Sequence, residues 1–471
     1  MTRQNRRPAG PAATGTRRTS YAVRIWDIRP YQGKRKTTYG VRWTVAGREF
    51  RETFDTKAHA KARQAELHRA AARGEAFDSN TGRPASEQAR ENQRSWYTHA
   101  VSYVDRRWDS LSGNSRQSIA EALATITPVL LTTMRGAPDG TTLRTALYGW
   151  AFNKKRRKAG QPPAEIDRAL RWVEAHTRPL ADLADTEVML DVLDAISRRL
   201  DGKPAAANTI ARKRAVLNNV LEHAIGNGLA ANPLPDAARK WHAPKTTEAV
   251  DPQVVVNRRH AEALLAAVAA IAPRLVAFFA CMYYAGLRPS EVIELRATSL
   301  DLPEGGGWGT LYLRKSAPAV GRAWTSTGTR RERRQLKHRG AEEVRPVPCH
   351  ARLTELLHGH LTEHGTTADG RLFRGSAGGD LSESVYGRIW AAARKAALTE
   401  AEAASPLAKR PYDLRHACLS TWLNAGVDPT QVAEWAGNSV AVLLRVYAKC
   451  ISGHDTIARQ RIEDALRGEH D

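Results

Sequence analysis

The sequence predicts a multi-domain fold that is mainly α-helical with small β-sheets, and three observations lead to it. The chain has 471 residues, too long for one ordinary domain and typical of about two to four. Alternating apolar and polar residues, the pattern of half-buried strands, are concentrated before residue 55. Beyond them, helical periodicity dominates two long stretches, 94–241 and 258–471.

The N-terminal region predicts a basic arm followed by a small domain. Residues 1–20 hold five arginines and no acidic residue, so we expect a disordered arm. In residues 21–75 we expect a helix over Thr56–Gly74, ended by its glycine. Three strands are expected before it, at Tyr21–Arg29, Tyr39–Val45 and Arg48–Phe54.

One face of this small sheet is expected to be basic and aromatic. Its members would be Arg24, Arg42, Arg48, Arg51, Trp26 and Trp43. Such a face can enter a groove of DNA, and Arg24 and Arg42 are the candidate contacts. The alternative is a structural domain whose charged side only meets water.

A polar linker, 76–93, leads to a helical domain at 94–241. Its expected helices are Trp96–Leu111, Ser115–Thr133, Thr142–Lys154, Pro163–Ala175, Asp185–Leu200 and Ala207–Asn227. Two basic runs interrupt them, and solvated helix ends are the simpler explanation for each run. The candidate DNA contacts in these runs are Lys154, Lys155, Arg156, Arg157, Arg212 and Lys213.

A Pro-containing linker, 242–257, precedes the last domain, 258–471. We expect this domain to be mostly helical, with a strand-rich insert. Short strands are expected at Leu311–Arg314 and at Val344–Pro348.

The composition points to a polyanionic partner. The net charge is +23 and the isoelectric point is near 10.2. A protein with such a charge most often meets nucleic acid, although a merely solvated basic surface gives the same numbers.

Cysteine usage and hydrophobicity indicate a cytoplasmic protein. The four cysteines are dispersed without CxxC spacing, so neither a zinc site nor a disulfide framework is expected. The longest apolar run, Ala261–Leu287, is interrupted by Pro273 and Arg274 and is not expected to span a bilayer.

Two arginines and a late tyrosine carry the chemistry. Arg288 follows Gly286-Leu287 and precedes Pro289, which favours a helix start there. Arg415 lies in Tyr412-Asp413-Leu414-Arg415-His416, and Tyr447 follows 32 positions later. Guanidinium groups bind phosphate oxygens in a bidentate way, and a phenol can attack phosphorus. The acidic clusters that hold catalytic metals in polymerases and nucleases are absent from the sequence.

These motifs resemble those of the tyrosine recombinases, the phage-type integrases. The family's first-arginine motif, Gly-Leu-Arg-x-Ser-Glu, is complete at 286–291. Its second motif, His-x-Leu-Arg-His, is matched except that Tyr412 replaces the first histidine. The family's histidine nine residues before the tyrosine is replaced by Asn438.

The resemblance assigns roles to these residues. It makes Tyr447 the nucleophile that forms a 3′-phosphotyrosyl intermediate, with Arg288 and Arg415 on the phosphate and His416 and Glu291 in support. The family lysine lies in a β-hairpin before a Val-Pro-like strand, which favours Lys337, although a solvated basic loop is the plainer reading. Tyr412 and Asn438 stand where the family has histidines, so we expect a competent site in which these two replacements can slow cleavage.

The resemblance also implies a function and partners. A site-specific recombinase of a bacterial mobile element would bind double-stranded attachment sites, integrate or excise the element, and act as a homotetramer without a cofactor. Accessory bending or directionality proteins and association with the nucleoid would be natural. The domains at 21–75 and 94–241 would then be arm-type and core-binding DNA-binding domains. Two alternatives stay open: an inactive DNA-binding regulator and a type IB topoisomerase.

Overall fold

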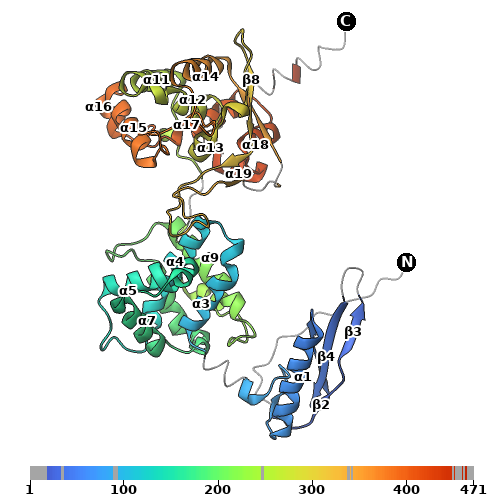
Figure 1. The fold of residues 1–471 in the computed structure, drawn as a ribbon. Helices are drawn as coiled ribbons and strands as arrows, with labels where there is room; N and C mark the ends of the chain where they lie inside the picture. The colour runs from blue at the N-terminus through green and yellow to red at the C-terminus, as the bar shows by residue number, and fades with distance from the viewer. Residues whose placement is uncertain are drawn as a thin grey trace. The chain divides into compact units, whose positions relative to one another are not determined.

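The computed structural model describes residues 19–32, 37–87, 94–245, 249–336, 340, 343–447, 450, 459 and 462–463. The chain forms two compact units (Figure 1). The first comprises Met1–Ser110 and Ser118–Pro244, and the second comprises Leu111–Gln117 and Lys245–Asp471. Helices dominate both units and the sheets are small, so the predicted fold class is confirmed.

The N-terminal sheet is built around the long strand β4 (Thr37–Val45). Strand β5 (Arg48–Phe54) pairs with one edge of β4, across the turn at Ala46-Gly47. The other edge pairs with two short strands, β2 (Val23–Ile25) and β3 (Arg29–Gln32). The single strand expected at 21–29 is therefore wrong: the chain breaks between β2 and β3 and continues along the same edge.

Helix α1 (Lys57–Ala72) covers one face of this sheet (Figure 1). Its start is capped by Thr56, whose side chain accepts a hydrogen bond from the backbone of His59. Trp43 lies in the core beneath α1 at 1% exposure, because it shares the inward face of β4 with Val41 and Val45. The prediction that Trp43 lies on the basic face is therefore wrong.

The segments at the borders of this domain are more ordered than the sequence suggests. Residues Thr19–Ser20 form strand β1, which pairs with β6 (Phe77–Asp78). Phe77 is fully buried in the same core as Trp43. A buried aromatic residue explains why part of the expected linker belongs to the folded domain.

The helical part of the first unit contains α3 (Trp96–Arg107), α4 (Gly113–Ile126, which starts in the second unit), α5 (Gly140–Ala146), α6 (Lys154–Ala159), α7 (Ala164–His176), α8 (Thr186–Ile196), α9 (Ala207–Ala224) and α10 (Leu234–Lys240). The helix expected at 142–154 is divided. A π-helical turn at Leu147–Ala151 ends it, and the Asn153 side chain caps a new helix, α6.

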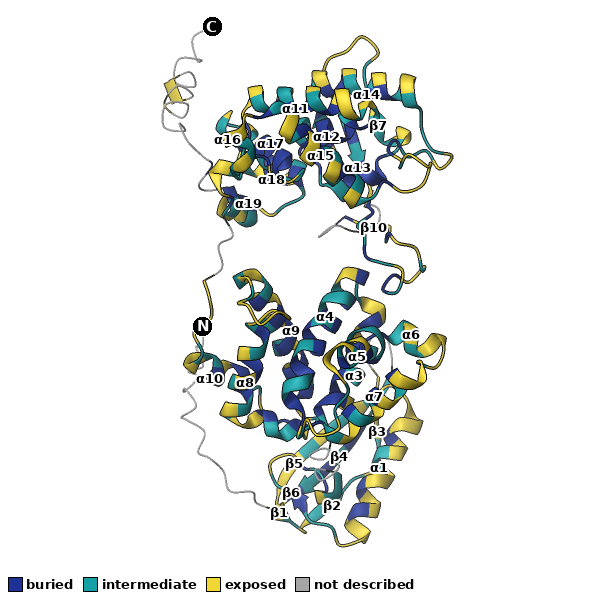
Figure 2. Ribbon diagram, turned by 90° about the vertical axis from the view of Figure 1, so that its left-hand side faces the viewer, coloured by how far each residue is buried: buried dark blue, intermediate teal, exposed yellow. Residues whose placement is uncertain are grey.

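The second unit is organised by its central helices. It contains α11 (Arg258–Ile271), α12 (Val276–Tyr284), α13 (Pro289–Glu294), α14 (Ala351–His364), α15 (Glu383–Ala397), α16 (Glu400–Ala404), α17 (Asp413–Asn424), α18 (Pro429–Ala436) and α19 (Val440–Tyr447). Helices α12 and α17 are mostly buried (Figure 2). These two helices form much of the interior of the unit, and the loops with the polar site residues pack against them.

A small sheet and a β-ribbon complete this unit. Strand β8 (Gly309–Leu313) pairs with β7 (Leu300–Asp301) and with β11 (Arg345–Cys349). Beyond them, β9 (Lys315–Ser316) pairs with β10 (Arg334–Gln335). None of the helices in the described part of the chain combines the length and hydrophobicity that a bilayer crossing requires.

Candidate active site

Arg288 sits at the N-cap of α13, directly before Pro289. Its backbone N–H donates to the Glu291 carboxylate at 2.8 Å, and its Nη1 donates to the same carboxylate at 2.9 Å. The remaining donors reach the turn after α18, at the carbonyls of Ala436 (3.1 Å) and Gly437 (3.0 Å). Burial opposes its charge, but Glu291 and Tyr412 raise the pKa of Arg288. The guanidinium is thus fixed in place and stays charged.

Arg415 is 1% exposed on helix α17, and its guanidinium meets the same turn. Its Nη1 donates to the Gly286 carbonyl, and its Nη2 donates to the Ala436 carbonyl at 2.9 Å. Burial, followed by the charge of Arg288, lowers the pKa of Arg415. The two arginines, 127 positions apart in the sequence, therefore converge on one loop and form a region of concentrated positive charge.

Gly286 makes this convergence possible. Its φ of +60° is a left-handed conformation that glycine adopts without strain. A Cβ at this position would lie 2.7 Å from the Leu419 side chain on α17, so α17 packs directly on the glycine backbone. That close approach brings the Gly286 carbonyl within reach of Arg415.

A third arginine, Arg345, belongs to this cluster and was not among the predicted site residues. It is 1% exposed, and its Nη2 lies 2.8 Å from the Glu291 carboxylate. Burial alone would raise the pKa of Glu291, but Arg345, Arg288 and Arg415 lower it to about 2. Glu291 is therefore an ionised carboxylate that ties two of the arginines together.

The turn after α18 is shaped by Gly437. Its φ of +64° ends α18 in a left-handed C-cap. A Cβ here would lie 2.1 Å from Nη1 of Arg345 and 3.4 Å from Nη1 of Arg288. Only glycine therefore leaves room for the Arg345 guanidinium beside this backbone.

Tyr447 lies at the end of α19 and is 2% exposed. Its hydroxyl is hydrogen-bonded to Nδ1 of His416, at 2.9 Å. Burial raises the pKa of Tyr447 well above its ordinary value near 10, so the phenol is protonated. Burial, with Arg415 and Arg410 nearby, lowers the pKa of His416 to about 4, so its ring is neutral at pH 7.

The two residues that replace family histidines also lie in the cluster. The Asn438 Oδ1 accepts from Arg288 at 2.6 Å and from Arg415 at 3.5 Å. The Tyr412 ring packs edge-on against His416, with 5.0 Å between ring centroids. Seven of the predicted site residues thus occupy one place: they are Arg288, Glu291, Tyr412, Arg415, His416, Asn438 and Tyr447.

Residues 255–450, which contain this whole cluster, match the model of the phage integrase family. This segment is a phage integrase domain. The family resemblance predicted from the motifs is confirmed for this segment, and the match supports the predicted class of enzyme, a tyrosine-type site-specific recombinase. No curated protein matches the sequence significantly.

Several solved integrase structures are similar to this chain. A fragment of the Tn1549 transposon integrase in complex with transposon right end DNA has 18% identity and a TM-score of 0.48, covering 66% of this chain and 96% of the fragment. A lambda integrase dimer bound to a COC′ core site has 16% identity and a TM-score of 0.41, covering 87% and 91%. A lambda integrase tetramer bound to a Holliday junction has 16% identity and a TM-score of 0.40, covering 87% and 95%.

The predicted lysine of the integrase site, Lys337, lies outside the described residues. Among the described residues, no group of three or more His, Cys, Asp or Glu side chains is arranged to hold a metal ion.

The candidate DNA contacts of the N-terminal sheet lie together on its open face. The Arg24 and Arg42 guanidinium groups lie 5.9 and 5.2 Å from the centre of the Trp26 ring. Arg42 also lies directly opposite Arg51 across the β4–β5 pair, and Glu49, 2.7 Å from its Nε, supplies a counter-charge.

The candidates in the helical part of the first unit are mostly held by carboxylates. Lys154 lies 2.6 Å from Asp109, Arg157 pairs with Asp105, and Arg212 lies 2.6 Å from Glu121. Arg156 lies over the Trp150 ring at 5.8 Å, and Lys155 is half-buried at the start of α6.

Lys213 differs from the other candidates because it is buried. It is 4% exposed and its ammonium lies 3.2 Å from Glu121. It occupies the inward face of α9 with Ile210 and Leu217, three and four positions away. The expectation that Lys213 contacts DNA is therefore wrong for this conformation: its charge serves an internal ion pair.

Proposed function

We propose that the chain cuts and rejoins DNA strands at its attachment sites through a 3′-phosphotyrosyl intermediate on Tyr447, and so integrates or excises a mobile element. The observation that carries this proposal is the single cluster in which a buried tyrosine, a neutral histidine and two fixed arginines meet. The arrangement supplies a nucleophile, a proton acceptor and positive charge within one loop region.

Arg288 and Arg415 would bind the non-bridging oxygens of the scissile phosphodiester. Backbone carbonyls already hold both guanidinium groups beside residues 436–438, and a phosphate would displace some of these neutral acceptors as it binds. Charge develops on these oxygens as the tyrosine attacks, and preorganised donors of this kind are typically worth several kcal/mol. Glu291 and Arg345 would act as positioning residues that keep Arg288 in register.

His416 would accept the phenolic proton. With its own proton on Nε2, the neutral ring offers the Nδ1 lone pair to the hydroxyl of Tyr447. A phosphodiester anion beside Arg415 would offset the positive field that now helps to hold the pKa of His416 low. Substrate binding would therefore make His416 a stronger base at the moment when one is needed.

The chemical step conserves the phosphodiester bond energy. The Tyr447 oxygen forms a bond to phosphorus while the bond to the 5′-oxygen breaks, and that oxygen leaves with a proton. By resemblance, Lys337 would supply this proton. Attack by a 5′-hydroxyl from a second cleaved strand reverses the step, releases Tyr447 and restores its proton from His416. No external energy source or cofactor is required.

Both units would hold the duplex. The basic face around Trp26 and the exposed arginine of α6, Arg156, are the candidate backbone contacts in the first unit. Strand exchange needs two cleaved duplexes, so we infer assembly as a homotetramer on DNA in the cytoplasm, with accessory proteins setting direction.

The test is a two-site recombination assay on supercoiled plasmids. The proposal expects recombinant joints only when two attachment sites are present, and none with Tyr447→Phe. Relaxation of a plasmid without any attachment site would instead indicate a topoisomerase. Binding without cleavage by the wild-type protein would indicate a regulator.

A further inference from the structure

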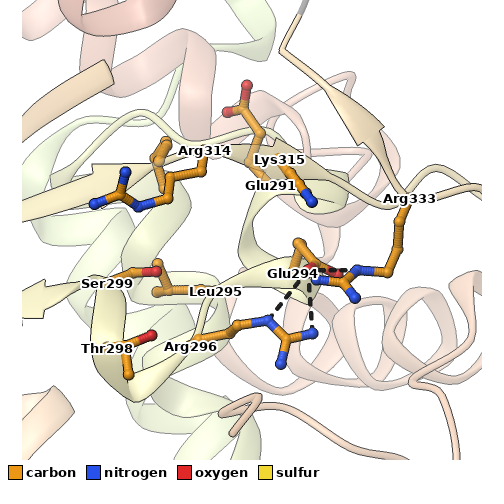
Figure 3. Close-up of a pocket in the computed structure, with 10 residues that line it drawn as sticks. Glu291, Glu294, Leu295, Arg296, Thr298, Ser299, Arg314, Lys315 and Arg333 are labelled. Atoms are coloured by element: carbon orange, nitrogen blue, oxygen red, sulfur yellow. Dashed lines mark hydrogen bonds and ion pairs between the residues drawn. The ribbon is translucent and has the colours of Figure 1, made fainter. Parts of the chain in front are cut away.

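A basic pocket lies beside the C-terminal part of α13. Its volume is ≈ 170 Å³, room for several water molecules or one tetrahedral oxyanion. Its basic and hydroxyl lining consists of Arg296, Thr298, Ser299, Arg314, Lys315 and Arg333 (Figure 3). Four of these side chains are cationic and two are hydroxyls.

Both carboxylates of the pocket are already committed. Glu294, 6% exposed, accepts from Arg296 at 3.2 Å and from Arg333 at 2.8 Å, and it lies between them in Figure 3. The Glu291 carboxylate points away from Glu294 and pairs with Arg288 and Arg345 instead. Glu294 therefore fixes two guanidinium groups at the pocket, and Glu291 contributes no counter-charge to it.

Two of the four cations that line the pocket have no counter-ion among the described residues. Arg314 and Lys315, at the end of β8 and the start of β9, are exposed, and no described carboxylate lies within ion-pair distance of either. Their side chains extend in opposite directions in Figure 3, so each adds a separate positive charge that a bound anion could neutralise. Thr298 and Ser299 add hydroxyl donors on the opposite wall.

We propose that this pocket binds a phosphate oxyanion of the DNA backbone, a few steps from the phosphate that is cut. Helix α13 (Pro289–Glu294) has six residues and is therefore about 9 Å long, with Arg288 at its start and Glu294 at its end. Phosphates of one strand advance about 3.4 Å per step along the duplex axis, so a duplex engaged at Arg288 passes the pocket within about three steps. This inference rests on the proposed function, because it needs DNA at Arg288.

The pocket would position the duplex rather than carry out chemistry. Glu291 forms part of its wall and also holds Arg288, so an anion in the pocket and the phosphate at Arg288 are bound by the two ends of one short helix. A phosphate seated there would fix the register of the strand and carry no sequence preference of its own.

The experiment measures the affinity of full-length protein for a mixed-sequence duplex over a range of salt concentrations. All proteins carry Tyr447→Phe, so binding is measured without cleavage. The test variant is Arg314→Gln with Lys315→Gln. The matched control, Arg388→Gln with Lys395→Gln, removes the same charge from the exposed side of α15. Melting temperatures show that each protein is folded.

The pocket variant should bind more weakly, and its slope of log affinity against log salt should be shallower by about 0.9, the loss of one phosphate contact. The control should keep the parental slope. An unchanged slope in the pocket variant, or an equal loss in the control, overturns the proposal. In a second arm, stabilisation by inorganic phosphate that depends on Arg314 and Lys315, without any change of slope, would assign the pocket to free phosphate and overturn the DNA assignment.

These outcomes are separable from failure of the proposed function. If wild-type protein never forms a covalent adduct, the catalytic proposal falls, but the salt dependence still reports on the pocket. If the adduct forms and the slopes do not differ, only the pocket proposal falls.

Discussion

The Tyr447 hydroxyl lies 2.9 Å from Nδ1 of His416, although the two residues are 31 positions apart and lie on different helices, α19 and α17. His416 directly follows Arg415, so the residue that contacts the nucleophile and the residue aimed at the phosphate loop are neighbours on one helix. In this chain the histidine beside the tyrosine is thus the one after the second arginine, while the family's earlier histidine position holds Tyr412.

His416→Gln should slow cleavage by about 10²–10⁴-fold, the usual contribution of a positioned base. The amide keeps a hydrogen bond to Tyr447 but cannot accept the proton. Single-turnover cleavage of saturated complexes measures the effect. DNA affinity is the internal control and should be unchanged; a rate within threefold of the wild type would contradict the role of His416.

The pH dependence of cleavage should reveal the same group. A base must be unprotonated, so the wild-type rate should fall as pH drops through the pKa of His416 in the DNA complex. That pKa should lie above its value of about 4 in the free protein, because the bound phosphodiester offsets the charge of Arg415. His416→Gln should lose this acidic limb of the profile. An identical limb in the variant would assign it to another group.

Tyr412→His should partly rescue His416→Gln. The Tyr412 ring packs against His416 at 5.0 Å, so an imidazole there would stand next to the missing base. We expect the double variant to cleave at least tenfold faster than His416→Gln, an effect of about 1.4 kcal/mol on the barrier. Tyr412→Phe in the same background is the matched control and should give no rescue. Equal rates for both double variants would contradict this account.

Glu291→Gln should destabilise the domain by about 3 kcal/mol at pH 7, because it leaves Arg345 and Arg288 without their shared counter-charge. The folded-state pKa of about 2 lies below the ordinary value of 4.5, so Glu291 contributes stability above pH 4.5 and loses it as pH falls toward 2. Urea unfolding at several pH values should show the gap between wild type and variant closing over that window. A gap independent of pH would mean that the ion pairs are not its source.

Gly437→Ala should be more harmful than a glycine substitution at a similar backbone conformation elsewhere. The matched control is Gly306→Ala, where φ is +78° and no atom lies within 4 Å of the added Cβ. Left-handed strain costs about 1–2 kcal/mol at either position. At Gly437 the clash with Arg345 should add about 1–3 kcal/mol of destabilisation and displace the guanidinium cluster. Equal losses of unfolding free energy in the two variants would show that the clash is relieved elsewhere.

Most residues of the site could be predicted from the sequence, but the contacts between them could not. Arg288, Arg415 and Tyr447 could be predicted because each lies in a short sequence motif with a characteristic spacing. Arg345 was missed, yet a signal existed: it shares the inward-facing register of β11 with Val347 and Cys349, where an unpaired charge would be costly. A charged residue in such a register indicates a buried partner, here Glu291.

Other features depend on tertiary packing that no local pattern encodes. The contact between His416 and Tyr447 follows from how α19 packs against α17. The two short strands that replace the expected strand at 21–29 follow from pairing along one edge of β4. The burial of Lys213 could have been predicted from the sequence, because its spacing from Ile210 and Leu217 places it on the buried side of α9.

Trapping of a covalent adduct tests the central claim most directly. A duplex of the chain's own attachment site, nicked beside the crossover, releases a short fragment after cleavage and prevents religation. Wild-type protein should become linked to the 3′ end of the cut strand on a denaturing gel, and Tyr447→Phe should bind the same DNA without forming the adduct. Absence of an adduct with the wild type, or an adduct that persists in Tyr447→Phe, would contradict the assignment of Tyr447 as the nucleophile.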